Sequence, residues 1–209
     1  MNDSDKLRKK SAFSRRGFLQ GVGATGGALG TGILTQEEAQ AQTAKGVITG
    51  ETPITLTING KPYKTTVEAR NTLLDVLRNN LDLTAAKRVC DRGTCGACTV
   101  IMEGKAVYAC TVLAIEAQGR KIETLEGLST GNTRHPLIDA FVNNDAQQCG
   151  YCTPGFVMAS KAMLDRTPSP TEQQVKEHLG GNLCRCGTYM GIRKAVVEAS
   201  KQLKGGARA

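Results

Sequence analysis

The first regular pattern in the chain is an alternation of apolar and polar residues over 54–58. A period of two is typical of a strand with one buried face. The dipeptide Asn59-Gly60 follows, which is the strongest short signal for a two-residue hairpin turn. A second strand is therefore expected at about 63–67.

A helix and three further strands are expected next. Asn71 or Thr72 can cap a helix whose buried stripe is formed by apolar residues between 73 and 81. The apolar pattern predicts strands at 99–102, 106–109 and 121–125. Strands wrapped around one helix make a small α+β domain, which we expect over residues 53–128, after a linker at 42–52.

After this domain the period changes from two to 3.6, which indicates helices. Four helix starts are expected, at Pro136, at Thr153-Pro154, at a capping box from Thr171 to Gln174, and at about Gly191. Thr153 is predicted to be a cap, because proline is tolerated at the first position of a helix. The second half is thus expected to be an all-α, four-helix domain over residues 129–204, with a tail at 205–209.

Composition indicates that both predicted domains need stabilising cross-links, such as disulfides or bound metal. Only 4% of the 209 residues are aromatic and tryptophan is absent, so two small domains would have thin cores. Eight cysteines can supply disulfides or metal ligands. The net charge is +8, but no basic run is interleaved with aromatic residues. Nucleic-acid binding is therefore not expected.

The N-terminus has the order of features of an export signal. A basic, polar segment leads to the pair Arg15-Arg16, a weakly apolar stretch follows over 21–34, and Ala39-Gln40-Ala41 is a candidate cleavage site. The apolar stretch is shorter than the roughly 20 residues of a membrane span. We therefore expect a twin-arginine signal peptide over 1–41, a periplasmic location and no stable membrane span. This route carries folded proteins, which suits a chain that acquires a cofactor before export.

The cysteines fall into two sets of four, one in each predicted domain. The first set is Cys90, Cys95, Cys98 and Cys110, which has the plant-ferredoxin spacing C-x4-C-x2-C…C. Gly93 and Gly96 would let the backbone pass close to a cluster and leave amides free to donate to sulfur. The second set is Cys149, Cys152, Cys184 and Cys186, at junctions between predicted helices.

Three kinds of site compete for these cysteines. Disulfides are possible in an exported chain with an even number of cysteines. Zinc sites are possible too, although they usually pair two C-x2-C units and neither set does so. Two iron–sulfur clusters, each most simply a 2Fe–2S cluster on four cysteines, account for all eight residues. The cations Lys87, Arg88, Arg92 and Arg185 lie beside ligands and are either partners of a negative cluster or ordinary surface charges.

Three motifs in order carry a resemblance to a known family. They are CDRGTCGACTV at 90–100, QCGYCTPG at 148–155 and GNLCRCGTY at 181–189. Together they resemble the small iron–sulfur subunit of the molybdenum hydroxylases, the family of xanthine dehydrogenase and aldehyde oxidoreductase. The twin-arginine start is similar to that of periplasmic aldehyde oxidoreductases. One departure is Val89, where the family usually has glycine; valine would be strained there if the position needs a positive φ.

The resemblance implies a fold, a set of ligands and partners. The fold would be a β-grasp 2Fe–2S ferredoxin domain followed by a four-helix 2Fe–2S domain. The second set would hold the cluster nearer a molybdopterin cofactor on a large partner subunit, with Gln148 and Cys186 against that pterin; a capping role is the alternative for Gln148. The first set would hold the outer cluster, facing a flavin (FAD) subunit or a cytochrome.

The function expected is therefore electron transfer. The chain would relay electrons from the molybdenum site of an exported aldehyde oxidoreductase through its two clusters to the acceptor. The same role in an N-heterocycle or purine hydroxylase is the alternative, and a disulfide- or zinc-stapled binding protein is the alternative from another class. No catalytic acid, base or nucleophile is expected, and His135 and His178 are expected to be structural.

Overall fold

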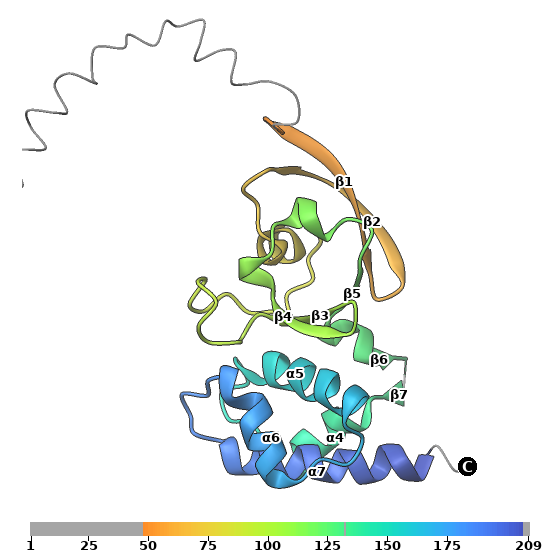
Figure 1. Ribbon diagram of the computed structural model, residues 1–209, viewed down its shortest axis with the longest axis vertical. Helices are drawn as coiled ribbons and strands as arrows, with labels where there is room; N and C mark the ends of the chain where they lie inside the picture. The colour runs from red at the N-terminus through yellow and green to blue at the C-terminus, as the bar shows by residue number, and fades with distance from the viewer. Residues whose placement is uncertain (1–47, 132, 207–209) are drawn as a thin grey trace, which may run out of the picture. The chain divides into compact units, whose positions relative to one another are not determined.

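The computed structural model describes residues 48–131 and 133–206, which form a sheet-containing part followed by a helical part (Figure 1). The twin-arginine pair, the candidate cleavage site and the first half of the predicted linker lie outside these residues. None of the helices in the described ranges is both long enough and apolar enough to cross a bilayer.

The predicted hairpin is confirmed. Strand β1 (Glu51–Ile58) pairs antiparallel with β2 (Lys61–Glu68), and Ile58 lies opposite Lys61. The two turn residues, Asn59 and Gly60, both have positive φ angles, 51° and 75°. Asparagine and glycine tolerate this left-handed backbone, which a two-residue turn between right-twisted strands requires.

The remaining strands complete a mixed sheet in the order β2-β1-β5-β3-β4. Strand β3 (Thr99–Met102) pairs antiparallel with β4 (Lys105–Tyr108), and β5 (Lys121–Glu123) lies between β1, to which it is parallel, and β3. The three predicted strands therefore exist, with shifts of one or two residues at their ends.

The helix before the cysteine loop begins where expected but winds differently. It starts as α3 (Leu73–Asp75) and continues as a wider π-helical turn over Val76–Asn80. Thr72 is the cap: its hydroxyl accepts from the Asp75 amide at 3.1 Å, and the Asp75 carboxylate accepts from the Thr72 amide at 3.0 Å. Four apolar side chains of this segment are buried, namely Leu73, Leu74, Val76 and Leu77.

The second half is helical, as predicted. Its helices are α4 (Pro136–Asn143), α5 (Thr153–Arg166), α6 (Glu172–His178) and α7 (Tyr189–Gly206). The capping box of Thr171 and Gln174 opens α6 as expected. A short hairpin of β6 (Ser129–Thr130) and β7 (Thr133–Arg134), which the sequence pattern did not predict, precedes α4.

The predicted cap of α5 is wrong by one residue. Cys152, not Thr153, is the N-cap, because its carbonyl accepts the first helical hydrogen bond, from the Phe156 amide at 3.2 Å. Thr153 is the first helical residue and its buried hydroxyl has no partner among the described residues. The shift places the Cys152 thiol at the start of the helix.

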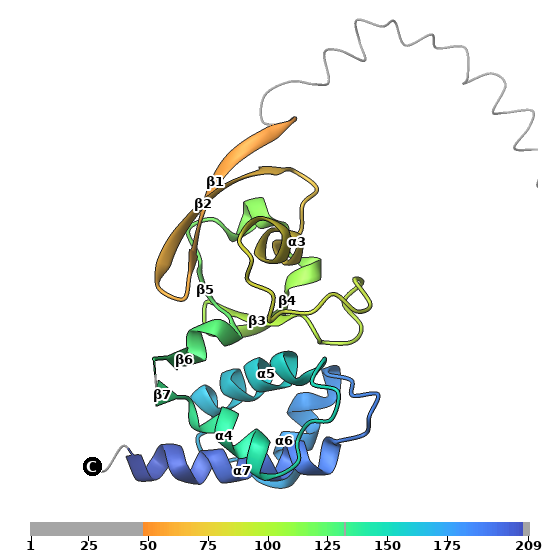
Figure 2. The same cartoon turned by 180° about the vertical axis from the view of Figure 1, so that it is seen from behind.

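Helix α5 joins the two halves. It lies along β3, and both views show it between the sheet and α7 (Figures 1 and 2). Ile101 from β3 and Met158 and Ala162 from α5 form a small buried cluster at this contact. Each half also has its own apolar core, so the cysteine loops lie on packed supports.

Candidate metal centre

The first cysteine set converges from a loop and from a turn behind it. Cys90, Cys95 and Cys98 lie between the π-helical turn and β3, and Cys110 lies in a 3₁₀ turn that follows β4. Two hydrogen bonds bring the turn against the loop: the Ala109 N–H donates to the Cys98 carbonyl at 3.2 Å, and the Gly93 N–H donates to Cys110 Sγ at 3.3 Å. Burial raises the pKa of the Tyr108 phenol, and the nearby cysteine thiolates raise it further.

Backbone amides of this loop point at sulfur. Gly93 donates its N–H to Cys110 Sγ at 3.3 Å, and Thr94 donates its N–H to Cys90 Sγ at 3.4 Å. Gly93 has a φ of 70°, and a Cβ there would lie 2.8 Å from Thr111 Cγ2. The glycine is therefore needed for the backbone to bring its amide to the thiol.

The second set lies at two helix junctions. Cys149 and Cys152 precede α5, and Cys184 and Cys186 lie between α6 and α7. Cys184 is buried and its sulfur lies 3.2 Å from Thr188 Oγ1, whereas Cys149 and Cys186 are exposed. One side of this set thus faces the protein core and the other faces the surface.

Each set has the number of thiols that a two-iron cluster takes. In a cluster of two irons bridged by two sulfides, each tetrahedral iron takes two thiolates. Cys90, Cys95, Cys98 and Cys110 supply four in the first set, and Cys149, Cys152, Cys184 and Cys186 supply four in the second.

The donors present are thiols. All eight cysteines are free, and among residues 48–131 and 133–206 no three His, Cys, Asp or Glu side chains are placed to share one metal ion. Thiols with amide donors beside them suit an iron–sulfur cluster, because such donors offset the negative charge on sulfur.

The pKa values of the thiols differ widely within each set. Hydrogen bonding, first from the Thr94 side chain, lowers the pKa of Cys90 to about 6. Burial raises the pKa of Cys98 to about 12 and that of Cys152 to about 12. Burial also acts to raise the pKa of Cys184, but hydrogen bonds from Thr188 outweigh it and lower the pKa to about 7. Ligand binding at the buried thiols must therefore displace protons.

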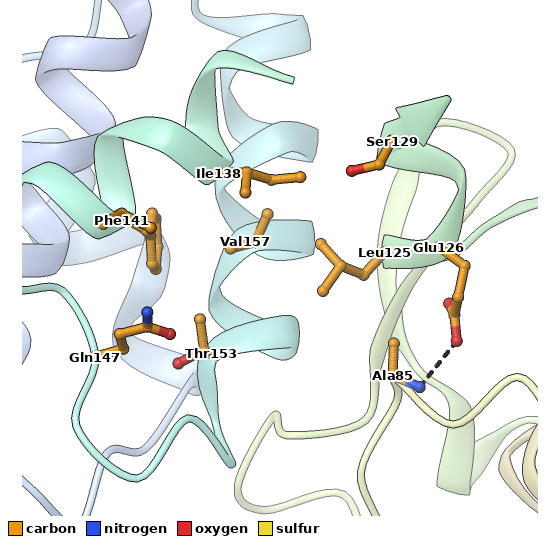
Figure 3. Close-up of a pocket in the computed structure, with 10 residues that line it drawn as sticks. Ala85, Leu125, Glu126, Ser129, Ile138, Phe141, Gln147, Thr153 and Val157 are labelled. Atoms are coloured by element: carbon orange, nitrogen blue, oxygen red, sulfur yellow. Dashed lines mark hydrogen bonds between the residues drawn. The ribbon is translucent and has the colours of Figure 1, made fainter. Parts of the chain in front are cut away.

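Two neighbouring glutamines occupy different places. Gln148 is exposed beside Cys149, on the open side of the second set. Gln147 instead lines a mainly apolar cavity of about 390 Å³ with Phe141, Val157 and Leu125 (Figure 3). No cysteine lines this cavity, so we do not identify it with the redox site. At its edge the Glu126 carboxylate accepts from the Ala85 N–H at 2.9 Å.

The three cations beside the first set, Lys87, Arg88 and Arg92, have local partners. Arg88 forms an ion pair with Asp75, Lys87 donates to the Thr84 carbonyl at 2.8 Å, and Arg92 donates to the Cys90 carbonyl at 3.0 Å. These side chains fix the loop rather than point at sulfur. Val89 is not among the described residues with positive φ and is 55% exposed, so the expected strain is absent.

Three residues of the site were missed by the sequence patterns. Tyr108 and Asn182 cross between the two halves, and Thr188 bonds to a thiol. The only sequence signal for them was their position within or beside the cysteine motifs. A polar residue there is otherwise indistinguishable from a surface residue.

Comparison with known protein families agrees with this site. A model described as 2Fe-2S iron-sulfur cluster binding domain matches residues 56–125, and a model described as [2Fe-2S] binding domain matches residues 124–197. The two matches meet between the two halves of the fold.

Similar proteins are subunits of oxidoreductases. The aldehyde oxidoreductase iron-sulfur-binding subunit of Escherichia coli is 41% identical over 167 residues, 73% of each chain. One of the nicotinate dehydrogenase subunits of Pseudomonas putida is 44% identical over 151 residues, 72% of this chain and 96% of the relative.

Solved structures give the same result. A chain of quinoline 2-oxidoreductase from Pseudomonas putida 86 matches with a TM-score of 0.67 at 40% identity, over 73% of this chain and 97% of that chain. The aldehyde oxidoreductase from Desulfovibrio desulfuricans matches with a TM-score of 0.70 at 39% identity, over 73% of this chain but 17% of that chain. The protein therefore belongs to the family of 2Fe–2S iron–sulfur subunits of the molybdenum hydroxylases, and it is an electron-transfer subunit of an oxidoreductase.

Proposed function

We propose that this chain is the iron–sulfur subunit of an exported, molybdenum-containing aldehyde oxidoreductase. Cys90, Cys95, Cys98 and Cys110 would hold one 2Fe–2S cluster, and Cys149, Cys152, Cys184 and Cys186 would hold the second. When bound, such clusters supply one-electron oxidation and reduction. Substrate chemistry would take place on the partner subunit.

The hydrogen bonds to sulfur in the first set are the observation that carries this proposal. The amides of Gly93 and Thr94 donate to Cys110 Sγ and Cys90 Sγ, and each set supplies four free thiols for two irons. Donors of this kind stabilise the negative charge of a reduced cluster. The chain thus provides ligands and charge compensation, and it needs no acid or base of its own.

The proposed partner is a large subunit that binds the molybdopterin cofactor. The exposed side of the second set supports this, because Gln148, Cys149 and Cys186 are all accessible there. In the Desulfovibrio desulfuricans relative the matching segment is only 17% of the chain, so much more protein adjoins it. We propose that Gln148 and Cys186 contact the pterin, and that a flavin (FAD) subunit or a cytochrome accepts electrons near the first set.

The substrate class has a second candidate. Relatives named for nicotinate and quinoline are as similar to this chain as those named for aldehydes, with 44% and 40% identity against 41% and 39%. An N-heterocycle hydroxylase would use this subunit in the same way. The aldehyde proposal rests on the predicted export signal, and the purified complex assayed with an aldehyde and with nicotinate would decide between the two.

The location and the finer fold are also proposals. Export through the twin-arginine route to the periplasm is supported by the order of features in residues 1–41. The mixed sheet and the helices α4, α5, α6 and α7 support a β-grasp ferredoxin domain over 53–128 and a four-helix domain over 129–204.

Iron and sulfide analysis tests the proposal directly. The purified complex should contain about four irons and about four acid-labile sulfides per copy of this chain, since eight thiolates serve two clusters. It should be red-brown and show two electron paramagnetic resonance signals after reduction. About two irons per chain, or stoichiometric zinc in a colourless protein, would contradict it.

A further inference from the structure

The two cysteine sets are joined by a short backbone contact. Residues 181–183, which lead into Cys184, lie against the loop that holds Cys95 and Gly96. The Leu183 N–H donates to the Cys95 carbonyl at 2.9 Å. Cys95 belongs to the first set and Leu183 precedes a member of the second, so one hydrogen bond and the chain itself connect the two sets.

Asn182 holds this contact in place. It is only 5% exposed, and its side-chain amide donates to the Gly96 carbonyl at 2.9 Å and to Thr99 Oγ1 at 3.3 Å. Thr99 in turn donates its hydroxyl to the same Gly96 carbonyl at 2.6 Å. A buried amide that bonds across two halves of a fold fixes their separation, because leaving it unpaired is costly.

Two glycines, Gly96 and Gly155, allow these segments to pack closely against each other. A Cβ at Gly96 would lie 2.6 Å from Asn182 Nδ2, and a Cβ at Gly155 would lie 2.3 Å from the Gly96 carbonyl oxygen. Tyr108 adds a further bond, from its hydroxyl to the Gly181 carbonyl at 2.9 Å. Three segments distant in sequence therefore meet at the Gly96 carbonyl.

We propose that Asn182 is a positioning residue for electron transfer between the two cysteine sets. It holds the Leu183–Cys95 hydrogen bond closed, and electrons tunnel more readily through covalent and hydrogen bonds than across an open gap. One electron crosses at a time, so one set's cluster is oxidised and the other's is reduced, and no bond or proton changes. This inference rests on the proposed function.

The test uses the full chain in its complex with the large subunit, both as wild type and as Asn182→Ala. The control is Asn144→Ala, because the Asn144 amide also bonds to a backbone carbonyl, of Ala140 at 2.9 Å, and to Glu198 at 2.6 Å, but entirely within the helical half. Freeze-quench paramagnetic resonance follows reduction of each cluster after mixing with substrate. A second readout, independent of turnover, is the magnetic splitting between the two clusters after full reduction with dithionite.

In Asn182→Ala we expect reduction of the second set's cluster at the wild-type rate, but a several-fold slower passage of the electron to the first set's cluster, because the Leu183–Cys95 contact is no longer held closed. The magnetic splitting should also shrink, while Asn144→Ala leaves both readouts unchanged. Wild-type rate and splitting in Asn182→Ala would overturn the inference, as would an equal change in the control.

A second variant keeps the test decisive if Asn182→Ala loses iron. Thr99→Val is nearly isosteric and removes one of the two acceptors of the Asn182 amide, while the direct bond to the Gly96 carbonyl can remain. A smaller slowing in the same direction is therefore expected, and no slowing would refute the inference. Failure of the proposed function is recognised separately, because the wild-type complex would then lack two clusters.

Discussion

At the scale of single residues, His135 makes the stability of the N-terminus of α4 depend on pH. Its Nδ1 accepts a hydrogen bond from the Leu137 N–H at 3.2 Å and so caps α4. Burial lowers the pKa of His135, the nearby Lys161 lowers it further, and Asp165 opposes them. The folded protein therefore disfavours protonation of this side chain, which would also remove the accepting lone pair.

This predicts a loss of stability in mild acid. A folded-state pKa below the unfolded value of about 6.5 stabilises the fold fully above pH 6.5, and that stability is lost as the pH falls through the folded pKa. Denaturant unfolding at pH 7.5 and 5.5 should show a smaller pH effect in His135→Asn, since asparagine caps without titrating in this range. The pKa of His178 is lowered too, first by burial, so part of the effect should remain. Equal pH effects in both proteins would exclude His135 as a source.

The proposed export signal gives a second prediction at this scale, at Arg15 and Arg16. Replacing both with lysine keeps the charge but removes the pair that defines a twin-arginine signal. We expect an assembled, active complex that stays in the cytoplasm. Fractionation of cells followed by activity and iron assays checks this. Unchanged activity in the periplasm would show that the pair is incidental.

At the scale of elements, α5 is the support that brings the two halves together. Its first turn carries Cys152 as N-cap, and its Gly155 faces the backbone of the Gly96 loop. Further along, Met158 and Ala162 pack on Ile101 of β3. One helix therefore positions a thiol of the second set and the loop of the first.

Gly155→Ala should disturb this support strongly. The added methyl would lie 2.3 Å from a backbone oxygen, which cannot move aside as a flexible side chain could. Overpacking of this kind costs about 1–3 kcal/mol. Gly180→Ala is the matched control, because a Cβ there meets nothing within 4 Å. Thermal unfolding should separate the two variants clearly, and similar midpoints would contradict the packing argument.

At the scale of the whole molecule, the two cysteine sets differ in exposure. Cys95, Cys98 and Cys110 are buried in the first set, whereas Cys149 and Cys186 of the second are exposed beside Gln148. An exposed ligand pair suits a site that a partner subunit covers. This asymmetry favours the order in which electrons enter at the second set and leave from the first.

The order predicts different outcomes for two cysteine variants. In Cys95→Ser the first cluster should be lost or shifted in potential, because serine is a harder ligand. Substrate should still reduce the remaining cluster in a single turnover, while steady-state transfer to the acceptor collapses. Rapid-freeze paramagnetic resonance measures both. If the remaining cluster stays oxidised while the molybdenum content is intact, the order is wrong.

Cys184→Ser should act on assembly instead. Cys184 lies in the core of the helical half, which is small, and under the proposed function a cluster would cross-link it. We expect poor recovery of the complex with the large subunit, seen by size-exclusion chromatography. Full recovery with one cluster missing would show that the helical half is stable without its cluster.

The amino-acid sequence by itself determined the features that depend on neighbours along the chain. The alternation over 54–58 and the Asn59-Gly60 turn specify a hairpin, and the capping box at Thr171 and Gln174 specifies a helix start. The spacing of the cysteines likewise assigns four to each half. The hairpin turn and the helix cap rest on contacts within a few residues, which the local sequence pattern encodes.

Only the tertiary structure decided how the distant parts meet. The hydrogen bond from Asn182 to Gly96, the one from Tyr108 to Gly181 and the close approach of Gly155 to the Gly96 carbonyl all join segments many residues apart. These features follow from packing α5 against β3, and no period or spacing along the chain records which side chains that packing brings together.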